Sequence, residues 1–490
     1  MSLKYCPSAM LVFLLAGLGL ASYAAKSEKP NLLIIYTDEH NFRTLGCYRE
    51  LMSDDQSFVW GAGVKVDTPH LDSLAEGGAI CTSYYAASPV CTPSRAAFVA
   101  GKYPVATGAW SNNEPMHDDV VTFAEQLRRH GYKTAYVGKW HLDGKKKPGF
   151  EPERKFGFSD NRHMFNRGHW KVLKQDGDTS MPPNYSKEAK GNNYSLKGAK
   201  EDSFTTDYLT NRTIEIIDRD KDQPFCVMLS IPDPHGPEMV RAPYDSMFKD
   251  LLFKDPNTKH VTNRQIPKWN PQTGSNTADE FTEHEMAQYF GMVKCIDDNV
   301  GKLLAYLRET GLDKNTIVVF TADHGDLLGE HNRIEKGLPY EAAAKIPFII
   351  RYPARIPAGK VIHKASTNVD FMPTILGLMD IPQVEGTHGF DDSAVYLSSE
   401  KEVMDDRIVY FTKAGGSWLS VANYRYKLVV SREDKPWLFD LERDPDELIN
   451  FYQDPEYKAV GAKFMKDLKS KMELYNQGKL SEAEPKLQLQ

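Results

Sequence analysis

The chain alternates apolar, strand-like runs with amphipathic helical segments, and polar or charged residues follow nearly every strand-like run. A continuous apolar run indicates a strand buried on both faces, which is typical of a parallel sheet covered by helices. The strand-like runs are 31–36, 132–137, 225–231, 316–320 and 346–351, and the helical segments are 120–131, 204–217 and 283–310. This order predicts an α/β fold with a large, mostly parallel sheet flanked by helices.

Side chains that can bind metals or transfer protons follow the predicted strands. They are Asp38 and Glu39 after the first run, Lys139 and His141 after the second, His235 after the third, and Asp323 and His324 after the fourth. Ligands of open parallel sheets bind beyond the carboxyl ends of the strands. We therefore expect these side chains to converge at one edge of one sheet.

The first 24 residues have the pattern of a cleavable signal peptide. Lys4 precedes the apolar run 9–20, and small residues around Ala24 form a cleavage site. The apolar run is short for a bilayer span, so we expect no stable membrane span, although an uncleaved anchor is the alternative. The mature protein is expected to be periplasmic or secreted.

The rest of the chain divides by composition into two expected domains. Residues 25–390 carry the α/β pattern and form an N-terminal catalytic domain, in which the polar stretch 145–203 is a variable insertion that shapes substrate access. Residues 391–490 are expected to form a smaller C-terminal α+β subdomain. Its short strand-like runs are 408–413, 418–422, 427–430 and 437–439, with a helix over 458–474, and they suggest an antiparallel sheet.

Charge and cysteine content exclude some functions. The formal net charge is -7, so no overall basic excess points to nucleic-acid binding, and an anionic substrate has to be met by local cations. The six cysteines show no C-x-x-C motif or dense spacing, which argues against a disulfide scaffold.

One cysteine lies in the most distinctive motif of the chain, Cys91-Thr92-Pro93-Ser94-Arg95. Pro93 suits the first turn of a helix, Thr92 is a fair cap before it, and Gly101 is the expected end. Cys91 would then lie where free backbone N–H groups point, which is a natural anion site. A buried structural cysteine is the alternative interpretation.

This motif resembles the signature of the type I, formylglycine-dependent sulfatases of the alkaline phosphatase superfamily. Further segments resemble that family in order and spacing: 67–72, 138–141, 234–237, 323–325, 336, 340–341, 346–347 and 438–450. The resemblance implies an alkaline-phosphatase-like fold and sulfuric ester hydrolase activity. It also implies that a formylglycine-generating maturing enzyme oxidises Cys91 to an aldehyde. The hydrated aldehyde carries two hydroxyls, of which one attacks sulfur and the other then expels sulfate from the sulfated enzyme.

The same resemblance implies one divalent cation at the strand ends. Its expected ligands are Asp38, Glu39, Cys91, Asp323 and His324. Oxygen-rich ligands favour a hard cation, Ca²⁺ first and Mg²⁺ as the alternative. Glu39 stands where the family usually has a second aspartate, and His324 stands where asparagine is common.

The catalytic roles that the resemblance implies fall on six residues: Cys91, Arg95, Lys139, His141, His235 and Lys336. Arg95 is expected to bond the formylglycine hydroxyl and the metal-bound acids, while Lys139 and Lys336 contact sulfate oxygens. His235 protonates the leaving alcohol and His141 helps to deprotonate the second hydroxyl, tasks that suit a group titrating near neutrality. We expect His40, His70 and His331 to be structural.

The substrate is expected to be a sulfated carbohydrate, which the export signal and the polar insertion favour over a small aryl ester. Besides Lys139, His235 and Lys336, the expected substrate-binding residues are Arg162, His163, Arg167, His169 and Trp170. This cationic and aromatic cluster would suit a sugar with acidic groups, and a solvated basic loop is the alternative. Lys413 and Trp418 could reach the same mouth. Two other functions stay open: a phosphonate or phosphate ester hydrolase of the same superfamily, and a non-catalytic glycan-binding homologue.

Overall fold

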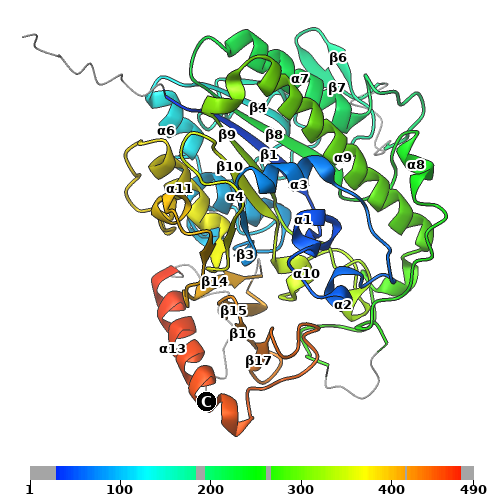
Figure 1. Ribbon diagram of the computed structural model, residues 1–490, viewed down its shortest axis with the longest axis vertical. Helices are drawn as coiled ribbons and strands as arrows, with labels where there is room; N and C mark the ends of the chain where they lie inside the picture. Colours follow the sequence, from blue (N-terminus) through cyan, green and yellow to red (C-terminus); the bar gives the residue numbers. More distant parts are fainter. Residues whose placement is uncertain (1–28, 184–193, 261–265, 414–415, 476–490) are drawn as a thin grey trace, which may run out of the picture.

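The computed structural model describes residues 29–183, 194–260, 266–413 and 416–475 (Figure 1). The predicted signal peptide lies outside these residues. Within them, no helix combines the length and the apolar character that a membrane crossing requires.

A nine-stranded sheet forms the centre of the molecule (Figure 1). From edge to edge its strands are β13 (Glu402–Val403), β11 (Lys360–Ile362), β2 (Ala79–Cys81), β10 (Phe348–Arg351), β9 (Thr316–Ala322), β1 (Asn31–Asp38), β8 (Phe225–Pro234), β4 (Lys133–Lys139) and β5 (Asp160–Phe165). Every neighbouring pair is parallel except the two pairs that include β10, which runs antiparallel to β9 and β2. The predicted mostly parallel α/β fold is confirmed.

Helices cover both faces of this sheet because side chains alternate along each strand. On β1, Leu33 and Ile35 pack into a core with one set of helices, and Leu32 and Ile34 pack into a second core with the other set. The first set is α3 (Pro69–Glu76), α7 (Thr205–Asp220) and α9 (Glu283–Glu309), and the second is α4 (Cys91–Ala100), α6 (Phe123–Arg129) and α11 (Phe371–Leu378). A strand buried on both faces needs apolar side chains on both, and the run Leu32–Tyr36 of β1 provides them.

The polar stretch 145–203 is more regular than its composition suggested. Its residues 160–165 form β5, which pairs in parallel with β4 and makes the edge of the large sheet. The short hairpin of β6 (Lys174–Asp176) and β7 (Thr179–Met181) follows. An edge strand has only one strand neighbour, and β5 is short and partly polar, so the sequence showed no apolar run there.

The last part of the chain forms a four-stranded antiparallel sheet beside the large one, drawn in orange and red in Figure 1. It consists of β14 (Val409–Thr412), β15 (Trp418–Ala422), β16 (Tyr426–Ser431) and β17 (Trp437–Asp440), and α13 (Lys458–Tyr475) packs on it. The expected small antiparallel sheet is therefore present. The chain adds β13 to the large sheet after residue 390, so the expected boundary falls before the last strand of that sheet.

The small sheet shares apolar cores with loops and helices of the preceding α/β part. Tyr85 and Tyr340 pack in one cluster with Trp418 and Trp437, and Ala97 of α4 packs in another with Tyr410 and its neighbours. A buried lysine of β16, Lys427, adds ion pairs of 2.8 Å to Glu341 and 2.5 Å to Glu447. This burial of apolar side chains holds the small sheet against α4, the helix that begins at Cys91.

Candidate active site

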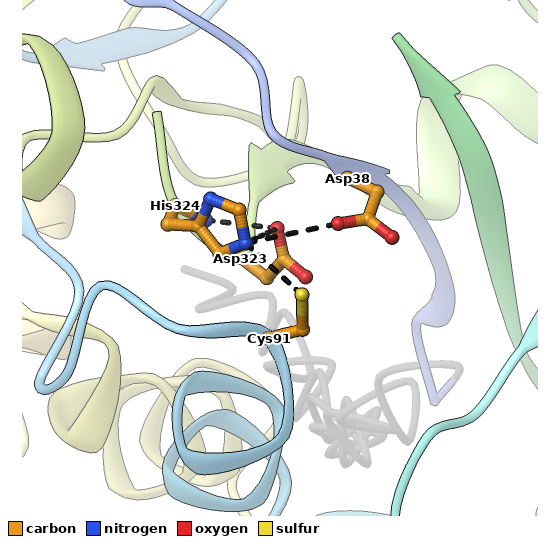
Figure 2. A group of neighbouring side chains, drawn as sticks. All are labelled: Asp38, Cys91, Asp323 and His324. Carbon is orange, nitrogen blue, oxygen red and sulfur yellow. Dashed lines mark hydrogen bonds and ion pairs between the residues drawn. The ribbon is translucent and has the colours of Figure 1, made fainter. Parts of the chain in front are cut away.

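Four buried side chains from three separate elements meet beyond the carboxyl end of the large sheet (Figure 2). Asp38 ends β1, Cys91 begins α4, and Asp323 and His324 follow β9. One ligand atom of each lies within 4.8 Å of the others, and Cys91 Sγ lies 3.2 Å from His324 Nε2. The structure thus brings together four of the five predicted metal ligands.

This group fits a divalent cation. Asp38 Oδ1 is buried and has no hydrogen-bond partner among the described residues. A buried carboxylate oxygen without a partner is costly, and a cation between Asp38 and Asp323 would satisfy it. Two carboxylates favour a hard cation, and the imidazole of His324 is compatible with it.

Glu39, the fifth predicted ligand, is not part of this four-residue group. The backbone leaves the strand at Glu39 with a left-handed φ of 62°, and its amide donates to Asp323 Oδ1 at 3.0 Å. Its carboxylate Oε2 lies 3.0 Å from Lys336 Nζ and 3.0 Å from His235 Nε2. The structure therefore places Glu39 with these two groups and outside the four-residue cluster.

The first turn of α4 presents position 91 to the cluster. The helix begins at Cys91, so Thr92 is inside it and is not the cap that the sequence predicted. Thr92 instead donates from Oγ1 to the His141 carbonyl at 2.7 Å and from its amide to Asn112 at 3.0 Å. Gly101 ends the helix as expected, with φ 61°. Burial raises the pKa of the Cys91 thiol, so unmodified Cys91 is a neutral thiol.

Arg95 holds the two acids in place. Its guanidinium lies 2.9 Å from Asp323 Oδ2 and 3.4 Å from Asp38 Oδ2, and it also donates to the Lys139 carbonyl at 2.7 Å. Burial alone would raise the pKa of Asp38, but the charges of Lys139 and Arg95 hold it well below the usual range. Asp38 is therefore an anion, as a metal ligand must be.

The backbone conformation of Gly138 places Lys139 at the site. Gly138 has φ 105°, and a Cβ there would collide with the Ser230 carbonyl, so only glycine fits. Lys139 Nζ contacts Asp38 Oδ2 and lies 2.7 Å from His169 Nε2.

Lys336 lies in a matching arrangement, 3.0 Å from Glu39 Oε2 and 2.7 Å from His235 Nε2. Burial lowers the pKa of Lys336, but neighbouring acidic groups, among them Glu39 and Asp38, outweigh it, and the net pKa lies well above the usual value. Lys336 is therefore a fixed cation. The two imidazoles beside the lysines, His169 and His235, stack with centroids 3.7 Å apart.

His141 and His235 both face the site as neutral imidazoles. His141 has a left-handed φ of 62°, and neither ring nitrogen has a hydrogen-bond partner among the described residues. Burial and nearby cations lower the pKa of both histidines well below the usual value. A neutral ring can accept a proton, and a bound anion would favour the protonated ring.

The predicted catalytic side chains, except Arg95, line one pocket of about 260 Å³. Its lining residues are Cys91, Asn112, Lys139, His141, Lys147, Arg167, Gly168, His169, Tyr194, His235, Glu335 and Lys336. Asn112, Lys147, Tyr194 and Glu335 were not predicted. They come from loops, where no periodic pattern points to them, and only the lysine run 145–147 gave any signal.

The structure divides the predicted sugar-binding cluster. Arg167 and His169 reach the pocket, but Arg162 pairs with Asp160 at 2.8 Å and His163 contacts Ser180 Oγ at 2.7 Å. Both of these lie within β5, whereas only residues beyond its carboxyl end at Phe165 reach the sheet edge.

Three further residues with expected roles at the mouth lie outside the pocket lining. Trp170 is 4% exposed and belongs to the core under α7. Trp418 is fully buried, and its Nε1 donates to the Gly337 carbonyl at 3.1 Å beneath the loop that carries Lys336. Lys413 lies beside Gly337.

Two of the histidines expected to be structural lie in packed surroundings. His40 is buried between Thr37 Oγ1 at 3.2 Å and Thr44 Oγ1 at 3.1 Å. His331 stacks on Tyr340 with centroids 3.5 Å apart. Neither ring lines the pocket.

Known structures define the class of fold. A protein solved in complex with its substrate D-glucosamine-2-N,6-O-disulfate superposes with a TM-score of 0.72 at 22% identity, over 92% of this chain and 99% of that one. Phosphonate monoester hydrolase of Agrobacterium radiobacter superposes with a TM-score of 0.68 at 21% identity, over 91% and 96%. The fold is thus the alkaline-phosphatase-like fold that sulfatases and phosphonate hydrolases share.

Sequence comparison narrows the class to a family. The sulfatase family model matches residues 30–381, and the C-terminal model of N-sulphoglucosamine sulphohydrolase matches residues 329–474. An ulvan-active sulfatase of Formosa agariphila is 29% identical over 88% of this chain and 79% of its own length. An N-acetylglucosamine-6-O-sulfatase of Bacteroides thetaiotaomicron is 26% identical over 98% and 94%. The chain belongs to the sulfatase family and is a sulfuric ester hydrolase.

Proposed function

We propose that this protein hydrolyses a sulfate ester of a carbohydrate at the pocket around Cys91. The observation that carries the proposal is the convergence of Cys91, Lys139, His141, His235 and Lys336 on one pocket beside the four-residue cluster. The names of the glycan-active relatives support a carbohydrate substrate.

Two groups absent from the chain as translated would complete the site. A divalent cation, Ca²⁺ by the hardness of the carboxylate ligands, would be held by Asp38, Asp323, His324 and position 91 and would neutralise sulfate oxygens. Formylglycine at position 91, made by a maturing enzyme, would supply one hydroxyl to attack sulfur and another to expel sulfate.

The chain's own cations would bind the sulfate. Lys139 and Lys336 line the pocket together, so an anion between them meets a fixed positive charge on each side. Arg95 contacts both acids of the cluster and keeps them oriented, which makes it a positioning residue. Preorganised charges of this kind contribute to catalysis because they need no rearrangement during the reaction.

We assign proton transfer to the two histidines. His235 would donate a proton from Nε2 to the leaving oxygen, and Glu39, 3.0 Å from that atom, would stabilise the protonated ring. His141, with both ring nitrogens free of other described partners, would accept the proton of the hydroxyl that expels sulfate. Glu39 is thus proposed as the partner of His235 and Lys336.

The first 24 residues support the proposal that the mature protein acts in the periplasm or outside the cell. Export would also place the enzyme where polymeric glycans are met.

A phosphonate or phosphate ester is the alternative substrate, because the phosphonate hydrolase neighbour shares the fold. A non-catalytic glycan-binding role is disfavoured because Cys91, Lys139, His235 and Lys336 are all present and line one pocket.

The test is release of free sulfate from a panel of sulfated mono-, oligo- and polysaccharides. The protein is co-expressed with a formylglycine-generating enzyme, conversion of Cys91 is verified by peptide mass, and Cys91→Ala is the control. Release that Cys91→Ala abolishes supports the proposal. If converted protein releases no sulfate but cleaves a matched phosphonate or phosphate ester, the alternative holds.

A further inference from the structure

The outer part of the active-site pocket carries two cations that the proposed sulfate chemistry does not use. Lys147 and Arg167 both line the pocket, together with Tyr194. The inner lysines, by contrast, each contact a carboxylate, Lys139 that of Asp38 and Lys336 that of Glu39.

Neither outer cation is neutralised by a described carboxylate. Within residues 29–183, 194–260, 266–413 and 416–475, no aspartate or glutamate forms an ion pair with Lys147 or Arg167. Lys147 Nζ donates to the Tyr194 hydroxyl at 2.8 Å, and Arg167 donates to Asn113 Oδ1 at 3.3 Å. Both partners are neutral, and the acid that lines the same pocket, Glu335, accepts a hydrogen bond from Asn276 Nδ2 at 2.8 Å and pairs with neither cation, so each cation can meet an anion.

The backbone holds the two cations next to each other. The Pro148 carbonyl, which follows Lys147, accepts hydrogen bonds from the amides of Asn166 at 2.8 Å and Arg167 at 3.0 Å. The two segments are therefore fixed together, which keeps the backbones of residues 147 and 167 close to each other.

A continuous row of contacts links Lys147 to the sulfate-binding end. From Lys139 Nζ the row passes to His169 Nε2 at 2.7 Å, then to the Tyr194 ring at 6.1 Å between centroids, and then to Lys147. An aromatic ring on the wall of a pocket offers an apolar face to a sugar ring. A saccharide whose sulfate ester lies between the two inner lysines would extend along this row toward the mouth.

We propose that Lys147 and Arg167 form a second anion subsite, which selects saccharides that carry a further oxyanion besides the scissile sulfate. The further group is a carboxylate of a neighbouring uronate or a second sulfate, and both present the same oxygens to lysine and arginine. This inference rests on the proposed function, because it places the scissile sulfate at the inner lysines. The neighbouring Lys145, which is exposed, and Lys146, which pairs with Asp143, do not line the pocket.

The experiment compares matched substrates and matched variants. Monosulfated glucose, galactose and N-acetylglucosamine are each paired with a counterpart that carries an added uronate and with one that carries a second sulfate. The readout is the ratio of kcat/KM for the dianionic member to kcat/KM for the monoanionic member. We expect Lys147→Gln and Arg167→Gln each to lower this ratio about tenfold or more, because each loses a charge-assisted hydrogen bond. Lys145→Gln, which removes the same charge two residues away, should leave the ratio unchanged.

A binding measurement makes the result independent of turnover. In the Cys91→Ala background, calorimetric titration should show about tenfold weaker binding of the dianionic saccharides on either substitution. A ratio equal to one in the unsubstituted enzyme, or equal losses on both members of each pair, overturns the subsite and leaves the proposed function standing. If no substrate releases sulfate, the proposed function fails, and the titration alone then tests the subsite. The subsite is overturned if neither substitution weakens binding, or if no probe binds.

Discussion

Each inner lysine of the pocket is bound to one acid and one imidazole. Lys139 contacts Asp38 and His169, and Lys336 contacts Glu39 and His235. The stacked pair of His169 and His235 connects the two sets. A change in the charge of any one member therefore alters the electrostatic field at the others, which is typical of active sites.

His141 stands apart from this network and allows a clean test of proton transfer. We expect His141→Ala to lower kcat by about 10²–10⁴-fold, the usual contribution of a general base, with a smaller change in KM. The melting temperature should be retained, because the ring has no hydrogen bond to lose among the described residues. His284→Ala, an exposed site on α9, is the control. Unchanged kcat on a substrate that the wild type hydrolyses would remove His141 from the mechanism.

The buried imidazole of His40 should make the stability of the protein depend on pH. Burial lowers its pKa to about 3, whereas an unfolded histidine titrates near 6.5. Below pH 6.5 the unfolded chain binds a proton that the native ring refuses, so stability falls as pH falls, by about 2 kcal/mol at pH 5.

The measurement for His40 is the drop in melting temperature between pH 7 and pH 5. It should be smaller in His40→Gln than in the wild type, while the exposed His284→Gln keeps the wild-type drop. Equal drops in wild type and His40→Gln would show that His40 is already protonated in the native state.

At the scale of elements, the strand that delivers His235 is tied to the segment after β5. Lys171, which is 1% exposed, lies 2.7 Å from Asp233 Oδ1, and Thr206 Oγ1 donates to Asp233 Oδ2 at 2.7 Å. His169 and His235 lie two residues from the two ends of this buried ion pair. The pair therefore keeps the two stacked rings in register.

We expect Lys171→Met to destabilise the protein by about 3–5 kcal/mol, because it leaves a buried carboxylate without its cation. Lys171→Met combined with Asp233→Asn should recover part of that loss. Thermal unfolding measures both, and Lys174→Met on the exposed β6 is the control. A single variant that melts with the wild type would show that the ion pair of Lys171 and Asp233 does not stabilise the fold.

The burial of an element decides whether it could be predicted from the sequence. β1, β8 and β9 contain the continuous apolar runs 32–36, 225–229 and 317–320 because both faces are covered, so these runs and the side chains at their ends could be identified. The antiparallel direction of β10 could not be predicted, because an apolar run does not indicate the direction of the strand in the sheet. β5 was missed because it is a short, half-polar edge strand, and with it the sequence misplaced Arg162 and His163.

At the scale of the whole molecule, the four-residue cluster joins β1, the start of α4 and the end of β9. A cation bound there would link these three elements and stabilise the native state by mass action, by about 2.7 kcal/mol at a hundredfold excess over Kd. The sequence predicted this convergence from strand ends, but of the loop side chains at the mouth it identified Arg167 and His169 and missed Asn112, Lys147, Tyr194 and Glu335. Loop conformation depends on contacts such as those of Pro148 with Asn166 and Arg167, which lie far apart in sequence.

Chelation should therefore abolish hydrolysis and also lower the melting temperature, and added Ca²⁺ should restore both. Asp323→Asn should remove the Ca²⁺-dependent rise in melting temperature. Asp298→Asn should keep it, although Asp298 lies in a second acidic group with His70 and Asp297. If the Ca²⁺-dependent rise in melting temperature were lost in Asp298→Asn, the cation would be assigned to that second group.

The core that α4 shares with the small sheet sets an order of events during synthesis. Ala97 packs with Tyr410 and Leu419, which the ribosome adds more than three hundred residues later, and Cys91 is 2% exposed once they are in place. A modifying enzyme that acts on Cys91 must therefore reach it before α4 is packed as it is in the folded protein. A cell that folds this chain faster than it modifies it would accumulate a well-packed protein with an unmodified thiol in its pocket.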